Sequence, residues 1–121
     1  MFWLIMAHSV MRWIILAAAV AALVGARAAG NRGAEGWGSR AGLAFTIALD
    51  VQVLLGLIIW LLESGWRHNA FFAFVHPLTM IAAMLIAHAG RRRQKGSTPA
   101  AGFWAYLVSL VLVVAAIPWW A

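Results

Sequence analysis

Two histidines, an arginine and an aspartate stand out because they lie inside long apolar runs of the sequence. His8 and Arg12 fall in the first run, Asp50 in the second and His76 in the third. Ionisable side chains inside a membrane helix are costly, so they usually face protein and mark a functional site. Imidazole is also an axial ligand of haem iron. The pattern therefore favours a cofactor site or an ion pair inside a membrane protein.

The composition points to the same class of protein. Of the 121 residues, 65% are hydrophobic and 10% are charged, whereas a soluble domain has about 25% charged residues. The chain has no cysteine, which excludes disulfides, thiolate metal sites and iron–sulfur clusters. The formal charge of +6 comes mostly from short loops between the apolar runs. These loops indicate membrane topology rather than a nucleic-acid partner.

Four segments are long and apolar enough to cross a bilayer, which takes about 20 residues. We expect an all-α integral membrane protein, an up-down-up-down four-helix bundle that forms one transmembrane domain over residues 1–121. The helices are predicted at residues 2–24, 41–62, 70–89 and 101–119. The loops after the first and third helices are basic, so the positive-inside rule places them in the cytoplasm and both termini outside.

Depth along the helices brings two histidines to one level. His8 and His76 each lie six residues from the predicted outer end of their helix, and Gly56 on the second helix falls at the same level. The first and third helices are diagonal in such a bundle. The two imidazoles are therefore placed to ligate one b-type haem from opposite sides, while Gly56 leaves room for the macrocycle. The alternative is a pair of neutral histidines that hydrogen-bond across helices.

Arg12 and Asp50 fall one turn deeper, about 3 Å apart in depth. We expect them to form a structural ion pair that fixes the packing of the helices. Arg12 is also placed to approach a haem propionate or a quinone carbonyl. His88 lies about 18 Å deeper than His76 and is interpreted as an interfacial side chain beside Arg91. Other polar or sulfur-containing residues are assigned to hydrogen bonding (Gln52, Thr46, Thr79, Ser109), core packing (Met80, Met84) or an exposed turn (His68).

Four short motifs follow one another along the chain: His8-Ser9-x-x-Arg12-Trp13, Asp50-x-Gln52-x-Leu54-Leu55-Gly56, His76-Pro77-Leu78-x-Met80 and Ile117-Pro118-Trp119. They resemble the motifs of small bacterial four-helix membrane proteins labelled cytochrome b-like, over nearly the whole chain. The resemblance implies a haem b protein of the bacterial inner membrane. It points at five positions, namely His8, Arg12, Asp50, Gln52 and His76. Two positions differ from the family pattern. Val75 stands where an acidic residue is expected, and Asp50 stands where some relatives carry histidine, so the ligands here need not match theirs.

We therefore expect a membrane protein that binds one b-type haem near the outer face. It would exchange electrons with a quinone or a periplasmic carrier, together with other membrane subunits. The alternative is a non-catalytic accessory subunit of a respiratory or photosynthetic complex, without a cofactor. A third interpretation, a proton or small-solute pathway through Arg12 and Asp50, lacks a continuous polar track to the cytoplasmic side. The chain has three acidic residues and no phosphate-binding loop. We therefore expect an electron-transfer protein or an accessory subunit rather than a stand-alone enzyme.

Overall fold

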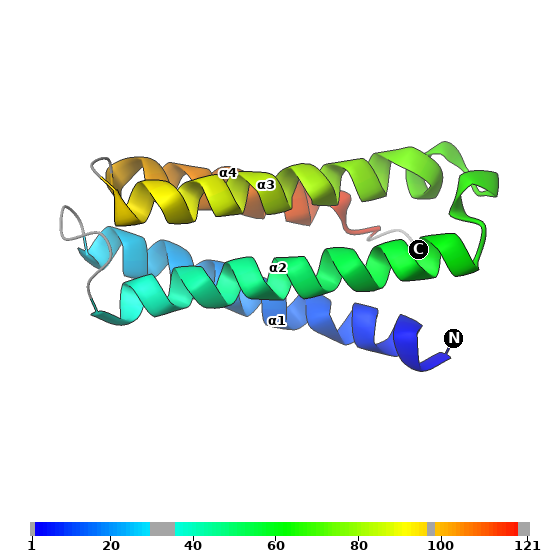
Figure 1. The fold of residues 1–121 in the computed structure, drawn as a ribbon, viewed down its shortest axis with the longest axis horizontal. Helices are drawn as coiled ribbons and strands as arrows, with labels where there is room; N and C mark the ends of the chain where they lie inside the picture. The colour runs from blue at the N-terminus through cyan, green and yellow to red at the C-terminus, as the bar shows by residue number, and fades with distance from the viewer. Residues whose placement is uncertain (1, 30–35, 97–98, 119–121) are drawn as a thin grey trace.

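The computed structural model describes residues 2–29, 36–96 and 99–118, and these ranges contain four α-helices (Figure 1). The helices are α1 (Phe2–Ala29), α2 (Gly36–Leu62), α3 (His76–Lys95) and α4 (Pro99–Ala116); a 3-10 turn, η2 (Gly65–Arg67), and a π-helical turn, η3 (Phe71–Val75), connect α2 to α3. Three apolar segments are long enough to cross a membrane, namely Phe2–Ala29, Gly36–Leu62 and Phe71–Lys95, while Ala100–Ala116 is shorter. The expectation of an all-helical chain of the membrane type is confirmed.

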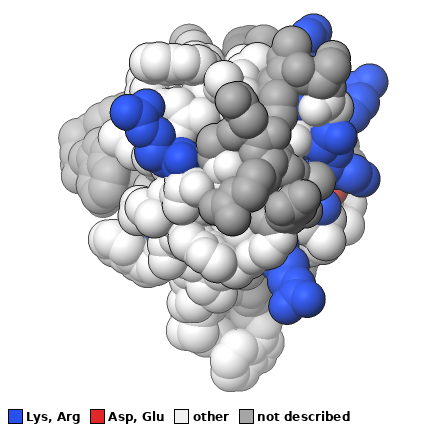
Figure 2. Space-filling model, turned by 90° about the vertical axis from the view of Figure 1, so that its left-hand side faces the viewer, with Lys and Arg blue, Asp and Glu red and all other residues white. Residues whose placement is uncertain are grey.

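The four helices form two antiparallel hairpins that lie side by side (Figure 1). One hairpin is α1 with α2 and the other is α3 with α4; the smaller contacts between hairpins join α2 to α3 and α1 to α4. Helices α1 and α3 are therefore diagonal neighbours across the bundle. We call the end where α2 finishes and α3 begins the pocket end. The opposite end, the basic end, faces the viewer in Figure 2 and carries Arg27, Arg40, Arg91, Arg92, Arg93 and Lys95.

The half of the bundle towards the basic end packs through small residues. Helix α1 buries one stripe there, made of Ile15, Ala19, Ala22, Ala26 and Ala29. A Cβ built on Gly25 would lie 2.6 Å from the Cα of Gly38, so α1 and α2 touch backbone to backbone. Lipid tails provide no hydrophobic force that drives helices together, so close approach through small residues has to supply the packing energy.

The outward-facing side chains are large and apolar on every helix. Among them are Val20, Leu54, Leu85 and Val111, whose exposed fractions are 55%, 60%, 59% and 58%. A soluble protein rarely exposes apolar patches of that extent. The outer surface therefore fits hydrocarbon rather than water.

The predicted helix boundaries were short at the basic end. Helix α1 continues to Ala29, α2 begins at Gly36 and α3 continues to Lys95, whereas the predictions placed these limits at residues 24, 41 and 89. Residue 119, the predicted end of the last helix, lies outside the described ranges. In α1 and α3 the helix formers alanine and arginine keep the chain helical beyond the apolar run that was used to set the limit. The first residues of α2 are Gly36-Trp37-Gly38-Ser39-Arg40, where Gly38 packs directly on Gly25 of α1.

Helical backbone begins at residue 70, as predicted, but the π-helical turn η3 precedes α3, and Pro77 gives the reason for that turn. Proline has no N–H, so the carbonyl four residues earlier, at Ala73, has no helical partner. The N–H of His76 instead bonds to the carbonyl of Phe71, which makes the π-helical turn η3. The indole Nε1 of Trp60 on α2 donates to the free Ala73 oxygen over 3.0 Å. This bond fixes the start of α3 against the end of α2.

Candidate functional site

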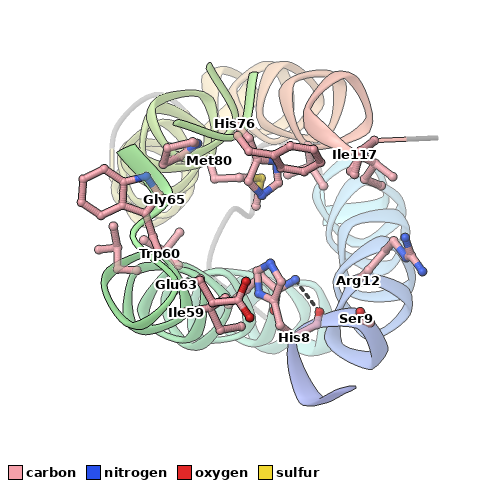
Figure 3. Close-up of a pocket in the computed structure, with 18 of the residues that line it drawn as sticks. His8, Ser9, Arg12, Ile59, Trp60, Glu63, Gly65, His76, Met80 and Ile117 are labelled. Atoms are coloured by element: carbon pink, nitrogen blue, oxygen red, sulfur yellow. Dashed lines mark hydrogen bonds between the residues drawn. The ribbon is translucent and has the colours of Figure 1, made fainter. Parts of the chain in front are cut away.

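A cavity of about 420 Å³ lies between the two hairpins at the pocket end (Figure 3). This volume is within the range of sites that bind cofactors and drug-sized molecules. Its wall is mainly apolar and includes Trp60, Phe72, Met80, Val113 and Ile117. The polar side chains on the wall include His8, Arg12, Gln52, Glu63, His68 and His76. A mainly apolar wall with a few convergent polar groups is the usual character of a ligand site.

The two histidines singled out by depth meet in this cavity. His8 comes from α1 and His76 from the first residue of α3, and both side chains point inward from opposite walls (Figure 3). Their ring centroids are 6.3 Å apart and the ring planes are at 85°. A metal bound to one nitrogen of each ring, with bonds of about 2 Å, requires centroids about 6 Å apart. The separation of the two rings thus matches that of two imidazoles on one metal ion.

The second nitrogen of His76 has a fixed partner. Its Nδ1 lies 2.8 Å from the carbonyl oxygen of Ala116 on α4. A carbonyl oxygen can only accept, so this contact assigns the proton to Nδ1 and leaves a lone pair on Nε2. Histidines that ligate metals usually donate their other N–H to such a carbonyl, which sets the tautomer and the ring orientation. His76 therefore has the hydrogen bonding of a ligand.

His8 is held by two residues of α2. The Nε2 of Gln52 donates to the backbone oxygen of His8 over 2.8 Å. A Cβ on Gly56 would lie 3.1 Å from Cε1 of the His8 ring. Gly56 lines the same cavity, and its missing side chain makes room for the imidazole of His8 rather than directly for a macrocycle. The Nδ1 of His8 is buried and has no hydrogen-bond partner in the described part of the chain.

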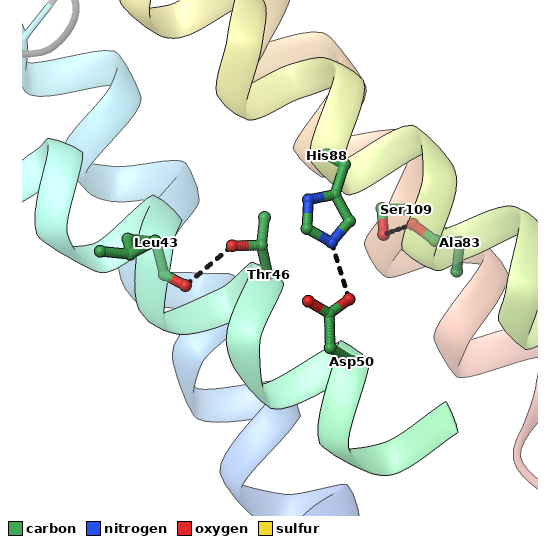
Figure 4. A network of polar contacts seen from close by, with 6 residues as sticks. All are labelled: Leu43, Thr46, Asp50, Ala83, His88 and Ser109. Atoms are coloured by element: carbon green, nitrogen blue, oxygen red, sulfur yellow. Dashed lines mark hydrogen bonds and ion pairs between the residues drawn. The ribbon is translucent and has the colours of Figure 1, made fainter. Parts of the chain in front are cut away.

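The predicted ion pair between Arg12 and Asp50 is wrong. Asp50 Oδ1 lies 2.7 Å from Nε2 of His88 on α3 instead (Figure 4). The guanidinium of Arg12 lies over the ring of Trp13, 5.1 Å from its centroid. Because Arg12 and Asp50 contact different partners, the interpretation as a proton pathway through both residues loses its basis.

The error came from comparing depth without the direction in which each side chain faces. The prediction placed His88 about 18 Å deeper than His76 and did not compare it with Asp50. In the structure His88 reaches Asp50 across the seam between α2 and α3. His88 was therefore interpreted as interfacial although it contacts a carboxylate.

The remaining sulfur and histidine assignments follow the expectations more closely. His68 is exposed at the mouth of the cavity, where its Nε2 contacts the Glu63 carbonyl oxygen at 3.2 Å. Met80 is buried on the cavity wall and Met84 packs against the core. The two methionines thus behave as packing residues, with Met80 placed one turn after His76.

Two polar contacts at the basic end were not predicted from the sequence. Arg91 donates to the Ser39 backbone oxygen and hydroxyl at 2.7 and 2.8 Å, and the Tyr106 hydroxyl donates to Gln94 Oε1 at 2.8 Å. Ser109, which was expected to form a hydrogen bond, donates to the carbonyl of Ala83 at 2.8 Å and joins α4 to α3 (Figure 4). Side chain to backbone bonds of this kind leave no periodic signal in a sequence.

Within the described residues there is no group of three or more histidine, cysteine or acidic side chains placed to hold a metal ion. A site of the His8–His76 type would thus need a metal that brings further ligands of its own, as haem iron does. Comparison with protein-family models, curated proteins and solved structures finds no match for the chain. The functional argument therefore rests on geometry.

Proposed function

We propose that this protein binds haem b between His8 and His76 and carries electrons within a membrane. The observation that supports the proposal most is the pair of facing imidazoles, 6.3 Å apart between centroids. The Nδ1 bond from His76 to Ala116 adds to it, since it leaves Nε2 for a ligand. When bound, haem b supplies a one-electron redox couple.

In this proposal the chain's own residues hold the haem and shield it from water. The two histidines, held by Gln52 and Ala116, would hold the haem with one imidazole each. The apolar wall around them keeps water out and lowers the local dielectric constant, which tunes a reduction potential. Two protein ligands leave no open position for a substrate, so the site favours electron transfer over catalysis at the metal.

The same proposal places the protein in the inner membrane of a bacterium. The positive-inside rule puts the basic end in the cytoplasm and the pocket end on the outer side. A quinone in the bilayer or a carrier outside it would be the redox partner, since the cavity would open near the outer face. The mostly apolar outer surface supports contacts with lipid and with other membrane subunits.

A second candidate, an accessory subunit without a cofactor, is favoured by a different observation. The side chains of Asp50 and His88 are 45% and 43% exposed on the seam between α2 and α3. Polar groups in a bilayer normally face protein. A partner subunit that covers this seam would shield the pair, whether or not haem is bound.

An optical spectrum separates the two candidates. Protein purified in mild detergent should carry haem, with a Soret band when oxidised and a sharp α-band after reduction with dithionite. Stoichiometric haem by pyridine haemochromogen assay would support the first candidate. Protein that purifies without haem, and gives no low-spin spectrum when haem b is added, would exclude it and leave the accessory subunit.

A further inference from the structure

Gln52 on α2 has a buried amide group, of which one end is bonded and the other is not. Only 6% of the residue is exposed, and it lines the cavity. Its Nε2 donates to the backbone oxygen of His8 over 2.8 Å. Its Oε1 is buried and has no hydrogen-bond partner in the ranges that the structure describes. A buried acceptor without a donor costs free energy, so we expect a donor to reach this oxygen in the working protein.

The imidazole of His8 has a buried nitrogen that would complement this oxygen. Its Nδ1 also lacks a hydrogen-bond partner in the described part of the chain, and the side chain of Gln52 lies beside the ring. Because protein atoms cover Nδ1, a metal in the cavity can bind His8 only through Nε2. A neutral imidazole bound in this way carries its proton on the other nitrogen. Nδ1 is then a buried donor that needs an acceptor.

The two hairpins support their histidines in a similar way. His76 on α3 has its acceptor on α4, the other helix of its hairpin, where the Ala116 oxygen lies 2.8 Å from Nδ1. His8 on α1 is contacted by Gln52 on α2, the other helix of the first hairpin. The two rings point into the cavity from opposite walls (Figure 3). An acceptor on α2 for His8 would give both imidazoles the same kind of support.

We propose that Gln52 is a positioning residue for His8, and that its amide oxygen accepts the Nδ1 proton when a metal occupies Nε2. The inference rests on the proposed function, in which that metal is the iron of haem b. Oε1 is bonded to the same carbon as the Nε2 that already holds His8, so a small rotation of the imidazole or the amide joins the two unpartnered atoms. Such a bond fixes the tautomer and the ring orientation, and it makes the imidazole a more basic ligand.

The reduction potential of the bound haem tests this role. A more basic imidazole stabilises oxidised iron more than reduced iron, so loss of the acceptor should raise the midpoint potential. Gln52→Met keeps the length of the side chain and removes the amide oxygen. We expect the redox equilibrium constant to change by about tenfold, the scale of one hydrogen bond, which is about 59 mV for a one-electron couple. Redox titration of the purified protein, followed at the α-band, measures this shift.

Further variants separate the hydrogen bond from a general structural effect. Gln52→Glu loses the amide N–H donor, as Gln52→Met does, but keeps an acceptor oxygen, so its potential should not rise above that of wild type. Thr46→Val removes another buried polar group of α2, which bonds to Leu43 and does not line the cavity, and should leave the potential unchanged. If Gln52→Met does not fold by circular dichroism, Gln52→Asn replaces it. This variant withdraws the amide oxygen by one methylene and should raise the potential in the same direction.

The possible failures are distinguishable. A low-spin spectrum with the wild-type potential in Gln52→Met overturns the role of Gln52 and leaves the haem site standing. An equal rise in Gln52→Met and Gln52→Glu would assign the effect to the lost N–H donor or to packing, and would also overturn it. If wild type gives no low-spin spectrum with haem b, the haem site and the positioning role both fall.

Discussion

The two halves of the bundle treat polar side chains differently. At the basic end, Arg91 and Tyr106 each form a hydrogen bond to a residue on another helix. The backbones of Gly25 and Gly38 also touch there. At the pocket end, the helices leave a cavity of about 420 Å³. Among the residues that the structure describes, His8 Nδ1, Arg12 Nε and Gln52 Oε1 are buried there without a hydrogen-bond partner.

The contrast indicates which half is built for packing and which for a ligand. Gln94 Nε2 is also buried without a partner, but it lies in the packed half and does not line the cavity. Unpartnered donors and acceptors beside a cavity are expected where a bound group completes them. A membrane bundle without a ligand would gain packing energy by closing such a space. Substitutions in the two halves should therefore have different effects on stability and on ligand binding.

Gly38→Ala should destabilise the packed half most. The added Cβ would lie 2.5 Å from the backbone oxygen of Gly25, and backbone atoms cannot rotate away. We expect the free energy of unfolding to fall by about 1–3 kcal/mol, the usual cost of overpacking. Unfolding in mixed detergent and SDS, followed by circular dichroism, measures it. An unchanged midpoint would mean that close packing of α1 on α2 is not what holds this half.

Tyr106→Phe removes the hydroxyl that bonds Gln94 Oε1. The amide oxygen of Gln94 is fully buried, so it loses its partner without gaining water. We expect a loss of about 1 kcal/mol in the free energy of unfolding. Haem binding should not change, because Tyr106 does not line the cavity. A shift of the Soret maximum or a weaker affinity for haem in this variant would show that the two halves are coupled.

Asp50 and His88 should show a small mutual coupling. The two side chains share a single 2.7 Å contact between helices, and polar contacts between membrane helices contribute little on average. A double-mutant cycle with Asp50→Asn and His88→Gln should give about 0.6 kcal/mol, the average for polar contacts between membrane helices. The matched cycle of Asp50→Asn with Arg12→Gln should give none. Coupling in the second cycle and not in the first would restore the discarded ion pair.

Gly56→Ala should have the smallest effect on unfolding and a clear effect on the site. Alanine favours the helix, while the new Cβ meets Cε1 of His8 at 3.1 Å, so the imidazole has to shift by a few tenths of an ångström. We expect a net stability change within about 0.5 kcal/mol and weaker haem binding by Soret titration. The same Gly→Ala change at Gly38 should do the reverse. Equal losses of stability at both glycines would remove the distinction between the halves.

Much of the fold could be predicted from the sequence because the apolar segments that form the helices are long. Apolar runs of about 20 residues define membrane helices regardless of tertiary contacts. The meeting of His8, His76 and Gly56 was predicted from depth alone, since helical rise is constant. The limits of the helices at the basic end were harder, because alanine and arginine continue a helix past its apolar run.

The missed features depend on local departures from regular geometry. Asp50 contacts His88 and not Arg12, because the direction in which each side chain faces cannot be read from depth alone. The bond from Trp60 to Ala73 follows from Pro77, whose missing N–H was visible in the sequence while its partner was not. The roles of Gln52 and Ala116 in holding the histidines require coordinates, because each uses a backbone oxygen.

The central claim is that His8 and His76 ligate one iron, and electron paramagnetic resonance tests it most directly. Oxidised wild-type protein and the matched variant His88→Gln should give a low-spin, six-coordinate signal. His8→Ala and His76→Ala should each lose it, through conversion to a high-spin signal or loss of haem. A low-spin signal that survives either replacement, or one that disappears in His88→Gln, would contradict ligation by this pair.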